Sequence, residues 1–249
     1  MIRLVKLTEE ELKRYDRQIR IENFGTKAQE KIREAKVVVA GVGGLGCVAS
    51  TYLAAAGVGE IVLIDREKVE FSNLNRQILH WEKDIGKFKV YSAAEKLRKI
   101  NPNVKIKEVA TEINDKNVYK LIKNADVVVD GLDNFKTRFL LNKACVELKI
   151  PFIHAAIHGL IGELMTIIPG KGPCYQCYIV EELEEVKPTP VLGATSGVVG
   201  CLEAIEAIKL IAEVGKPLTG KLLLFNGGTM EFTTLKIRRL KNCPVCKNL

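Results

Sequence analysis

Short apolar segments alternate with longer ones along most of the chain, and the first three set the pattern. Val37 to Ala40 is apolar and β-branched, residues 45–56 are mostly small, and Ile61 to Ile64 is apolar again. Four-residue apolar runs bounded by glycine and polar residues are typical of buried strands, whereas the middle segment has the length of a helix. Strand, helix and strand in this order predict a βαβ unit with parallel strands.

The same alternation continues towards the C-terminus. We predict helices over 87–100, 114–123, 135–148 and about 197–214, strands over 104–109, 126–130, 151–156 and 162–168, and a hairpin turning at Asn226-Gly227-Gly228. Ahead of the first strand, S/T-x-x-E/Q sequences start at Thr8 and Thr26. They predict two capping boxes, one for a helix from about Glu9 to Arg20 and one for a helix ending near Lys36.

A glycine-rich turn joins the first strand to its helix. Gly41, Gly43 and Gly46 form a G-x-G-x-x-G pattern, with Gly44 inside it. Such glycines allow a tight turn, a close approach of the backbone to phosphate and close packing of helix on strand. Asp65 ends the second strand 19 residues after Gly46, where this unit places an acid for ribose hydroxyls. The pattern predicts a nucleotide site, with glycines that only permit tight packing as the alternative.

Composition favours a single large α/β domain. The chain has 249 residues, 47% of them hydrophobic, which suffices for a full core. Residues 37–59 carry no charge and are long enough to span a membrane, but their glycines, Ser50 and Thr51 argue against a lipid-facing helix. The net charge of +8 suits phosphorylated ligands or an acidic protein partner, and without a recognisable motif we do not expect nucleic acid. The first residues hold no apolar secretion segment, so we expect a cytoplasmic protein without a membrane partner.

Four of the seven cysteines form two C-x-x-C pairs, Cys174 with Cys177 and Cys243 with Cys246. Two such pairs far apart in sequence can give four thiolates to a tetrahedral Zn²⁺ and leave no open position for catalysis. We therefore predict a structural zinc that holds the C-terminus to the central loop. A redox-active pair, or thiols unrelated to each other, is the alternative.

These elements together predict an α/β, Rossmann-like fold. We expect a mostly parallel central sheet flanked by helices, with N-terminal helices and a C-terminal zinc-pinned antiparallel extension. One domain would cover residues 1–249, with N-terminal helices in 1–35, a nucleotide-binding core in 36–168, and the zinc knuckles and C-terminal part in 169–249.

Charged residues follow two of the predicted strands. Arg76 and Lys89 belong to the loop-rich passage after Asp65, and ligands of open α/β sheets lie outside the carboxyl ends of the strands, within reach of such cations. Asp133 follows another buried strand and is placed either to cap the next helix or to bind Mg²⁺ on a triphosphate. His154 and His158 lie in an extended segment, and we interpret them as hydrogen-bonded core or pocket residues rather than metal ligands.

Several motifs in one order resemble the MoeB/ThiF/HesA family, the small relatives of ubiquitin-activating enzymes. They are RYDRQI at 14–19, the glycine turn, Asp65, SNLNRQ at 72–77, GKFK at 86–89, DGLDN at 130–134 and the paired C-x-x-C. The resemblance covers nearly the whole chain. It implies ATP-dependent adenylation, with Mg²⁺, of the C-terminal glycine carboxylate of a ubiquitin-like sulfur-carrier protein ending in Gly-Gly. Pyrophosphate would be released, as in molybdopterin or thiamine biosynthesis or ubiquitin-like modification.

The resemblance also implies roles for individual residues in a homodimer. Asp65 would bind the ribose, Arg76 and Lys89 the triphosphate, and Asp133 the Mg²⁺, while Arg17 would reach the phosphates of the neighbouring subunit. The implied nucleotide-binding residues are Gly41, Gly43, Gly44, Gly46, Asp65, Asn73, Arg76, Gln77, Lys89 and Asp133, with Asn73 and Gln77 supporting the phosphate loop. The implied catalytic residues are Arg17, Arg76, Lys89 and Asp133.

One departure from the family leaves thiol transfer open. Several members carry a cysteine between the first knuckle and the last long helix, but residues 178–200 contain none, and Cys201 falls inside the predicted helix. Three other functions compete with carrier adenylation. They are an NAD-binding oxidoreductase, a non-catalytic zinc-stabilised module that binds a ubiquitin-like protein, and an enzyme that adenylates a modified tRNA base or a short peptide.

Overall fold

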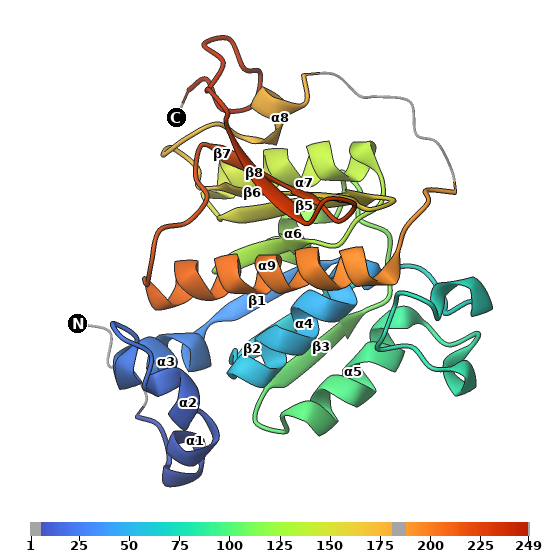
Figure 1. The fold of residues 1–249 in the computed structure, drawn as a ribbon, viewed down its shortest axis with the longest axis vertical. Helices are drawn as coiled ribbons and strands as arrows, with labels where there is room; N and C mark the ends of the chain where they lie inside the picture. Colours follow the sequence, from blue (N-terminus) through green and yellow to red (C-terminus); the bar gives the residue numbers. More distant parts are fainter. Residues whose placement is uncertain (1–5, 181–187, 249) are drawn as a thin grey trace.

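One twisted sheet organises the protein, seen here in a computed structural model that describes residues 6–180 and 188–248. Its strand order is β3-β2-β1-β4-β5-β6-β7-β8 (Figure 1). Five strands are parallel: β1 (Lys36–Ala40), β2 (Glu60–Ile64), β3 (Lys105–Val109), β4 (Val127–Asp130) and β5 (Phe152–His158). Three antiparallel strands extend the sheet beyond β5: β6 (Ile161–Ile167), β7 (Lys221–Asn226) and β8 (Glu231–Lys236). The predicted fold class is confirmed.

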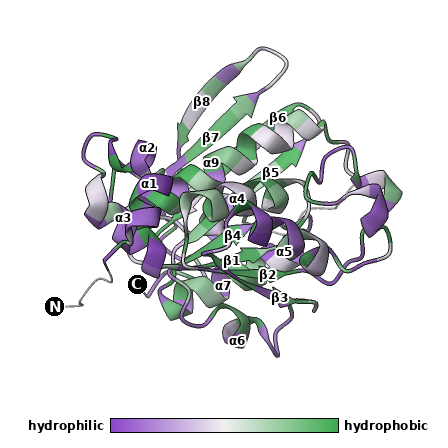
Figure 2. Ribbon diagram, turned by 90° about the horizontal axis from the view of Figure 1, so that it is seen from below, coloured by the Kyte–Doolittle hydropathy of each residue, from purple (hydrophilic) through white to green (hydrophobic). Residues whose placement is uncertain are grey.

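Helices cover both faces of the parallel part. Figure 2 shows α4 (Gly44–Ala56), α5 (Lys89–Ile100) and α9 (Gly193–Ala212) on one face, and α6 (Val118–Ile122) and α7 (Phe135–Leu148) on the other. Val37 and Val39 of β1 are buried in the layer under α4 and α9, while Val38 and Ala40 are buried in the opposite layer. The apolar run is buried along its whole length because successive side chains enter different layers.

The uncharged run from Val37 to Gly59 folds as most of β1, all of α4 and the turn that follows. Gly57 ends α4 with φ of +87°, a left-handed conformation that suits glycine. Across the described parts of the chain, no helix has both the length and the apolar character that crossing a bilayer requires.

The N-terminal helices differ from the prediction in two ways. The capping box at Thr8 is present, but the helix divides at Tyr15 into α1 (Glu9–Arg14) and α2 (Asp16–Ile19), with Tyr15 buried against Gly57. The box at Thr26 is wrong, because α3 (Gly25–Glu34) starts earlier and has Phe24 as its N-cap. Gln29 is instead buried, and its amide donates to the carbonyl of Ala56 at 2.8 Å. Packing against α4 therefore overrides the local capping pattern.

Two later boundaries also shift. Helix α6 begins at Val118 rather than near residue 114, because the side chains of Asn114 and Asn117 accept hydrogen bonds from the backbone N–H groups of Lys116 and Asn114 and form a turn there. Helix α9 begins four residues before the predicted position, at Gly193. The hairpin at Asn226 is confirmed, and all six residues of its outer strand, β8, are exposed. Figure 2 shows the β7–β8 hairpin projecting from the body of the molecule.

The strand order reverses at β1, which lies between β2 and β4. In open α/β sheets, ligands bind in the crevice outside the carboxyl ends of the strands at such a reversal. The turn that follows β1 and the loop that follows β4 meet at this point, because a Cβ atom at Gly131 would lie only 2.4 Å from the carbonyl oxygen of Gly41. The topology therefore places the glycine turn and the Asp133 loop side by side.

Candidate nucleotide site and cysteine cluster

The glycine turn is packed too closely for side chains at two of its positions. Gly41 has φ of +92°, and a Cβ atom there would lie 2.3 Å from the carbonyl oxygen of Gly131. A Cβ atom at Gly46 would lie 2.0 Å from the carbonyl oxygen of Gly41. Helix α4 has Gly43 as its N-cap and no side-chain cap, so its first N–H groups remain available to an anion.

Asp65 fastens the glycine turn to the end of β2. Its two carboxylate oxygens accept hydrogen bonds from the backbone N–H groups of Val42 (2.8 Å) and Glu67 (2.7 Å). Burial raises the pKa of Asp65 above its ordinary value, although both hydrogen bonds act in the opposite direction. Each carboxylate oxygen keeps a further lone pair for a hydroxyl donor.

The two predicted cations lie at the same edge of the sheet. Lys89, at the start of α5, is 3% exposed, and its Nζ lies 2.6 Å from Oε2 of Glu67. Arg76 donates to the carbonyl of Ser72 and to Oδ1 of Asn75, and its Cγ would be 3.8 Å from a Cβ atom at Gly44. The structure therefore brings Arg76 to the first turn of α4.

Asp133 is exposed in the loop between β4 and α7, and Oδ1 accepts a bond from the side-chain amide of Asn134 at 3.3 Å. Asn134, not Asp133, is the N-cap of α7 and accepts from the N–H of Thr137 at 2.9 Å. The capping interpretation of Asp133 is wrong, and its carboxylate remains available to a cation.

Of the two predicted supporting residues, Gln77 lies beside the glycine turn and Asn73 shapes the nearby loop, while Ser196 is an additional neighbour of the turn. Asn73 accepts from the N–H of Glu70 at 3.0 Å, which fixes the short 3₁₀ turn at Phe71–Asn73. The amide nitrogen of Gln77 would lie 3.7 Å from a Cβ atom at Gly43. Ser196 of α9 comes closer, because its buried hydroxyl would lie 2.8 Å from a Cβ atom at Gly44, and this hydroxyl has no partner among the described residues. Only the packing of α9 on the turn brings Ser196 there, and no motif signals it.

Arg17 lies at the other end of α4. The neighbouring Gln18 donates from its amide to the carbonyl of Ala56, close to the C-terminal end of that helix. A helix of 13 residues is about 20 Å long, which is further than an arginine side chain can reach. The structure does not bring Arg17 to the glycine turn of its own chain.

The two histidines of β5 lie in different environments. His154 is fully buried in β5, with Nδ1 2.7 Å from Asp130 and Nε2 3.2 Å from Glu163, as expected for a hydrogen-bonded core residue. His158, at the end of the same strand, is exposed. Arg138 of α7 is also buried and pairs with Asp130. Burial would raise the pKa of Asp130, but Arg138 and His154 hold it below its ordinary value.

The four knuckle cysteines form a compact cluster. Their sulfur atoms all lie within 4.8 Å of one another, with separations of 3.9 Å (Cys174 to Cys177), 3.6 Å (Cys174 to Cys243) and 3.5 Å (Cys177 to Cys246). Tetrahedral Zn²⁺ with bonds of about 2.3 Å requires sulfurs about 3.8 Å apart, so the cluster fits this ion. Burial raises the pKa of Cys174, and that of Cys246 to about 11, so these thiols need a cation to become thiolates.

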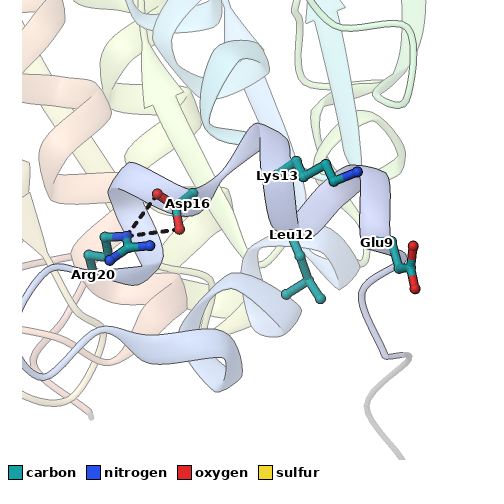
Figure 3. A pocket seen from close by; sticks show the side chains of 5 residues that line it. All are labelled: Glu9, Leu12, Lys13, Asp16 and Arg20. Carbon is teal, nitrogen blue, oxygen red and sulfur yellow. Dashed lines mark hydrogen bonds and ion pairs between the residues drawn. The ribbon is translucent and has the colours of Figure 1, made fainter.

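Two surface hollows are distinct from both the candidate nucleotide site and the cysteine cluster. One, of ≈ 520 Å³, lies on α1 and α2 beside the Asp16–Arg20 ion pair (Figure 3). Its walls carry charges of both signs, and α2 packs at the far end of α4 from the glycine turn. The other, of ≈ 500 Å³, lies between α4 and the start of α9 and includes Asn75 and the half-buried Cys201. Part of the cysteine-free stretch 178–200, residues 181–187, lies outside the described residues.

Comparison with known proteins gives one consistent result. A sequence profile of the ThiF family matches residues 15–245. The SAMP-activating enzyme E1 of Haloferax volcanii is 42% identical over 241 residues, covering 95% of this chain and 89% of that protein. The adenylyltransferase and sulfurtransferase MOCS3-1 of Drosophila pseudoobscura pseudoobscura is 41% identical, and the match covers 97% of this chain but 55% of that protein. A crystal structure of E. coli MccB with MccA-N7isoASN superimposes with a TM-score of 0.86 at 30% identity, covering 95% of this chain and 75% of that one.

Proposed function

Because the chain belongs to the ThiF family, we propose that it uses ATP to adenylate the C-terminal glycine carboxylate of a ubiquitin-like sulfur-carrier protein ending in Gly-Gly. One relative of about this length is named an activating enzyme, and longer relatives are named adenylyltransferases and sulfurtransferases, so the chain is an enzyme of the adenylyltransferase class. The observation that carries the proposal is the meeting of the glycine turn, Asp65, Lys89 and the Asp133 loop at one edge of the sheet.

The chemistry accounts for these residue types. A carboxylate would attack the α-phosphorus of ATP and expel pyrophosphate, so negative charge accumulates on phosphate oxygens. Fixed cations lower such a barrier, and the nucleophile is already ionised, so a general base has little to contribute. In this proposal Arg76 and Lys89 contact the phosphates, Asp65 holds the ribose, and Asn73 and Gln77 support the turn.

A magnesium ion would neutralise phosphate charge when bound, and Asp133 is the residue that would hold it. Its carboxylate is exposed and has one amide contact, from Asn134. The Cys174, Cys177, Cys243 and Cys246 cluster would hold a structural zinc away from the chemistry.

Carrier-dependent exchange of labelled pyrophosphate into ATP tests the function. We expect exchange with a small protein ending in Gly-Gly, and a loss of about 100-fold or more in Asp133→Ala, because one transition-state contact of this kind is worth roughly 3 kcal/mol. Asp115→Ala, which changes an exposed carboxylate before α6, is the control and should exchange normally. Nicotinamide binding without exchange would favour an oxidoreductase, and carrier binding without exchange a non-catalytic module.

The carrier itself can be found by affinity capture followed by mass spectrometry for an adenylated Gly-Gly terminus. An adenylated short peptide or tRNA base in place of such a protein would replace the proposed substrate class while keeping the reaction.

A further inference from the structure

A buried arginine lies directly beneath the loop that carries Asp133. The Arg138 guanidinium donates from Nε to Oδ2 of Asp130 at 2.9 Å, and from Nη2 to the carbonyl oxygens of Leu132 (2.5 Å) and Ala155 (3.1 Å). Asp130 also accepts from the N–H of Leu132 at 2.9 Å. Arg138 therefore ties the loop backbone to the ends of β4 and β5.

A second set of contacts supports the side chain of Asp130. His154 binds the same Oδ2 of Asp130 through Nδ1 at 2.7 Å, and its Nε2 lies 3.2 Å from Glu163. Glu163 accepts from the hydroxyl of Tyr178 at 2.7 Å, and the ring of Tyr175 lies 4.5 Å from that of His154. Both tyrosines belong to α8 (Tyr175–Tyr178), the short helix inside the first cysteine knuckle.

Asp133 depends on this support because little else fixes it. Its carboxylate is exposed and contacts Asn134 at 3.3 Å, so its position follows from the backbone of residues 131–133. That backbone is held at Gly131 by the glycine turn and at Leu132 by Arg138. A carboxylate that moves by even a fraction of an ångström loses the strict geometry that Mg²⁺ demands.

Packing alone does not explain an arginine in this position. Burying a guanidinium carries a large desolvation cost, and an apolar side chain of similar volume would fill the space as well. What arginine adds is a rigid fork of donors that can hold a carboxylate and two carbonyl groups at once, which lysine cannot do.

We propose that Arg138 is a positioning residue for Asp133, with His154 as its support, and that it sets the Mg²⁺ affinity of the nucleotide site. This inference rests on the proposed role of Asp133 as the magnesium ligand. Arg138 itself contacts the loop backbone and Asp130.

A double-mutant cycle of Arg138→Lys and Asp133→Asn, read by ATP binding over a range of Mg²⁺ concentrations, tests the inference. We expect Arg138→Lys to raise the Mg²⁺ concentration for half-maximal binding about tenfold, as supporting residues of metal ligands do, while leaving metal-free ATP binding within about twofold. In the Asp133→Asn background, the same change should have no further effect. Additive effects, or an equal loss of ATP binding with and without metal, would overturn the inference.

Two further variants keep the test decisive. Arg33→Lys alters another arginine ion pair, the one with Glu11, and should leave the Mg²⁺ dependence unchanged. His154→Gln, used if Arg138→Lys does not fold, should shift the Mg²⁺ dependence in the same direction by a smaller factor, and no shift would count against the inference. Mg²⁺-dependent ATP binding without pyrophosphate exchange would remove the proposed function but leave this cycle valid, whereas no ATP binding by the wild type would overturn both.

Discussion

Glu203 stands out at the scale of single residues. It lies in α9, is fully buried, and neither carboxylate oxygen has a hydrogen-bond partner within the described chain. Burial raises its pKa well above the ordinary value of 4.5, nearby Asp130 raises it further, and Arg138 acts in the opposite direction. An unpaired buried carboxylate is costly, so burial favours the neutral form of Glu203 in the folded protein.

Glu203→Gln should change how stability depends on pH. The unfolded chain ionises this carboxyl above about pH 4.5 and the folded chain does not, so its contribution to stability is complete below that pH and declines as the pH rises towards the folded pKa. Each unit of the raised pKa corresponds to about 1.4 kcal/mol. Glutamine does not ionise, so urea unfolding should show the stability of Glu203→Gln rising relative to that of the wild type as the pH increases above about 4.5.

Glu206→Gln is the matched control for that measurement. Glu206 is buried on the same helix but accepts bonds from Thr166, Lys209 and the N–H of Leu218. Glu206→Gln should have a lower free energy of unfolding than the wild type, and this difference should not shrink as the pH rises. Parallel pH profiles of the wild type and Glu203→Gln would contradict the neutral carboxyl.

Residues differ in how far the sequence alone could predict them. Asp65, Lys89 and Asp133 stand in short motifs beside predicted strands, so their approach to the glycine turn follows from topology. Ser196 and Glu203 have no such signal, because their surroundings come from elements far away in the chain. The partners of Arg138 are near in sequence, but no local pattern shows that its side chain is buried among them. The pattern of α7 and α9 predicts helices and does not say which polar side chains will be enclosed.

At the scale of elements, α8 and the C-terminal segment after β8 depend on each other. Cys174 is the N-cap of α8 and Cys177 lies within it, while Cys243 and Cys246 come from the segment that crosses back over it. An isolated helix of four residues is not stable in water. The cysteine cluster, together with the hydrogen bond from the N–H of Tyr175 to Asn142 of α7, therefore fixes α8 where Tyr178 reaches Glu163.

Cys243→Ser should release the C-terminal segment. A structural zinc that loses one of four thiolates binds much more weakly, so the link between this segment and α8 is weakened. We expect zinc content well below one equivalent and faster proteolysis of this segment. Cys201→Ser, a half-buried cysteine outside the cluster, should keep a full equivalent of zinc, and equal zinc content in both variants would refute the assignment.

Elements were predictable where one local pattern dominated. The apolar strands and the helix over 135–148 agree with the structure because β-branched runs and helical periodicity are local properties. The sequence does not predict the break at Tyr15 or the early start of α3. Both depend on tertiary packing, of Tyr15 on Gly57 and of Gln29 on Ala56.

At the scale of the whole molecule, the site is incomplete in one chain if Arg17 takes part. Arg17 lies on α2, at the opposite end of α4 from the glycine turn, and is exposed. A symmetric dimer could bring α2 of one chain to the turn of the other. The homodimer therefore remains a prediction that the position of Arg17 makes testable.

Mixed subunits provide that test. We expect Arg17→Ala and Asp133→Ala proteins to be inactive separately, and a mixture to recover up to about a quarter of the wild-type exchange per subunit. A mixed dimer has one site with both changes and one with neither, and random mixing makes half of the dimers mixed. The measurement is pyrophosphate exchange after the two proteins are mixed and allowed to equilibrate. No recovery, despite subunit exchange shown by native mass spectrometry, would place Arg17 outside the shared site.

The distance in sequence between the two knuckles bears on the order in which the protein assembles. Cys174 and Cys243 are 69 residues apart, and closing a loop of that size costs a flexible chain about 4 kcal/mol of entropy. The strands β6, β7 and β8 and the helix α9 lie within or beside that loop, and their pairing brings its ends together. We therefore expect the pairing of these strands to bring the four cysteines together before a zinc ion binds them.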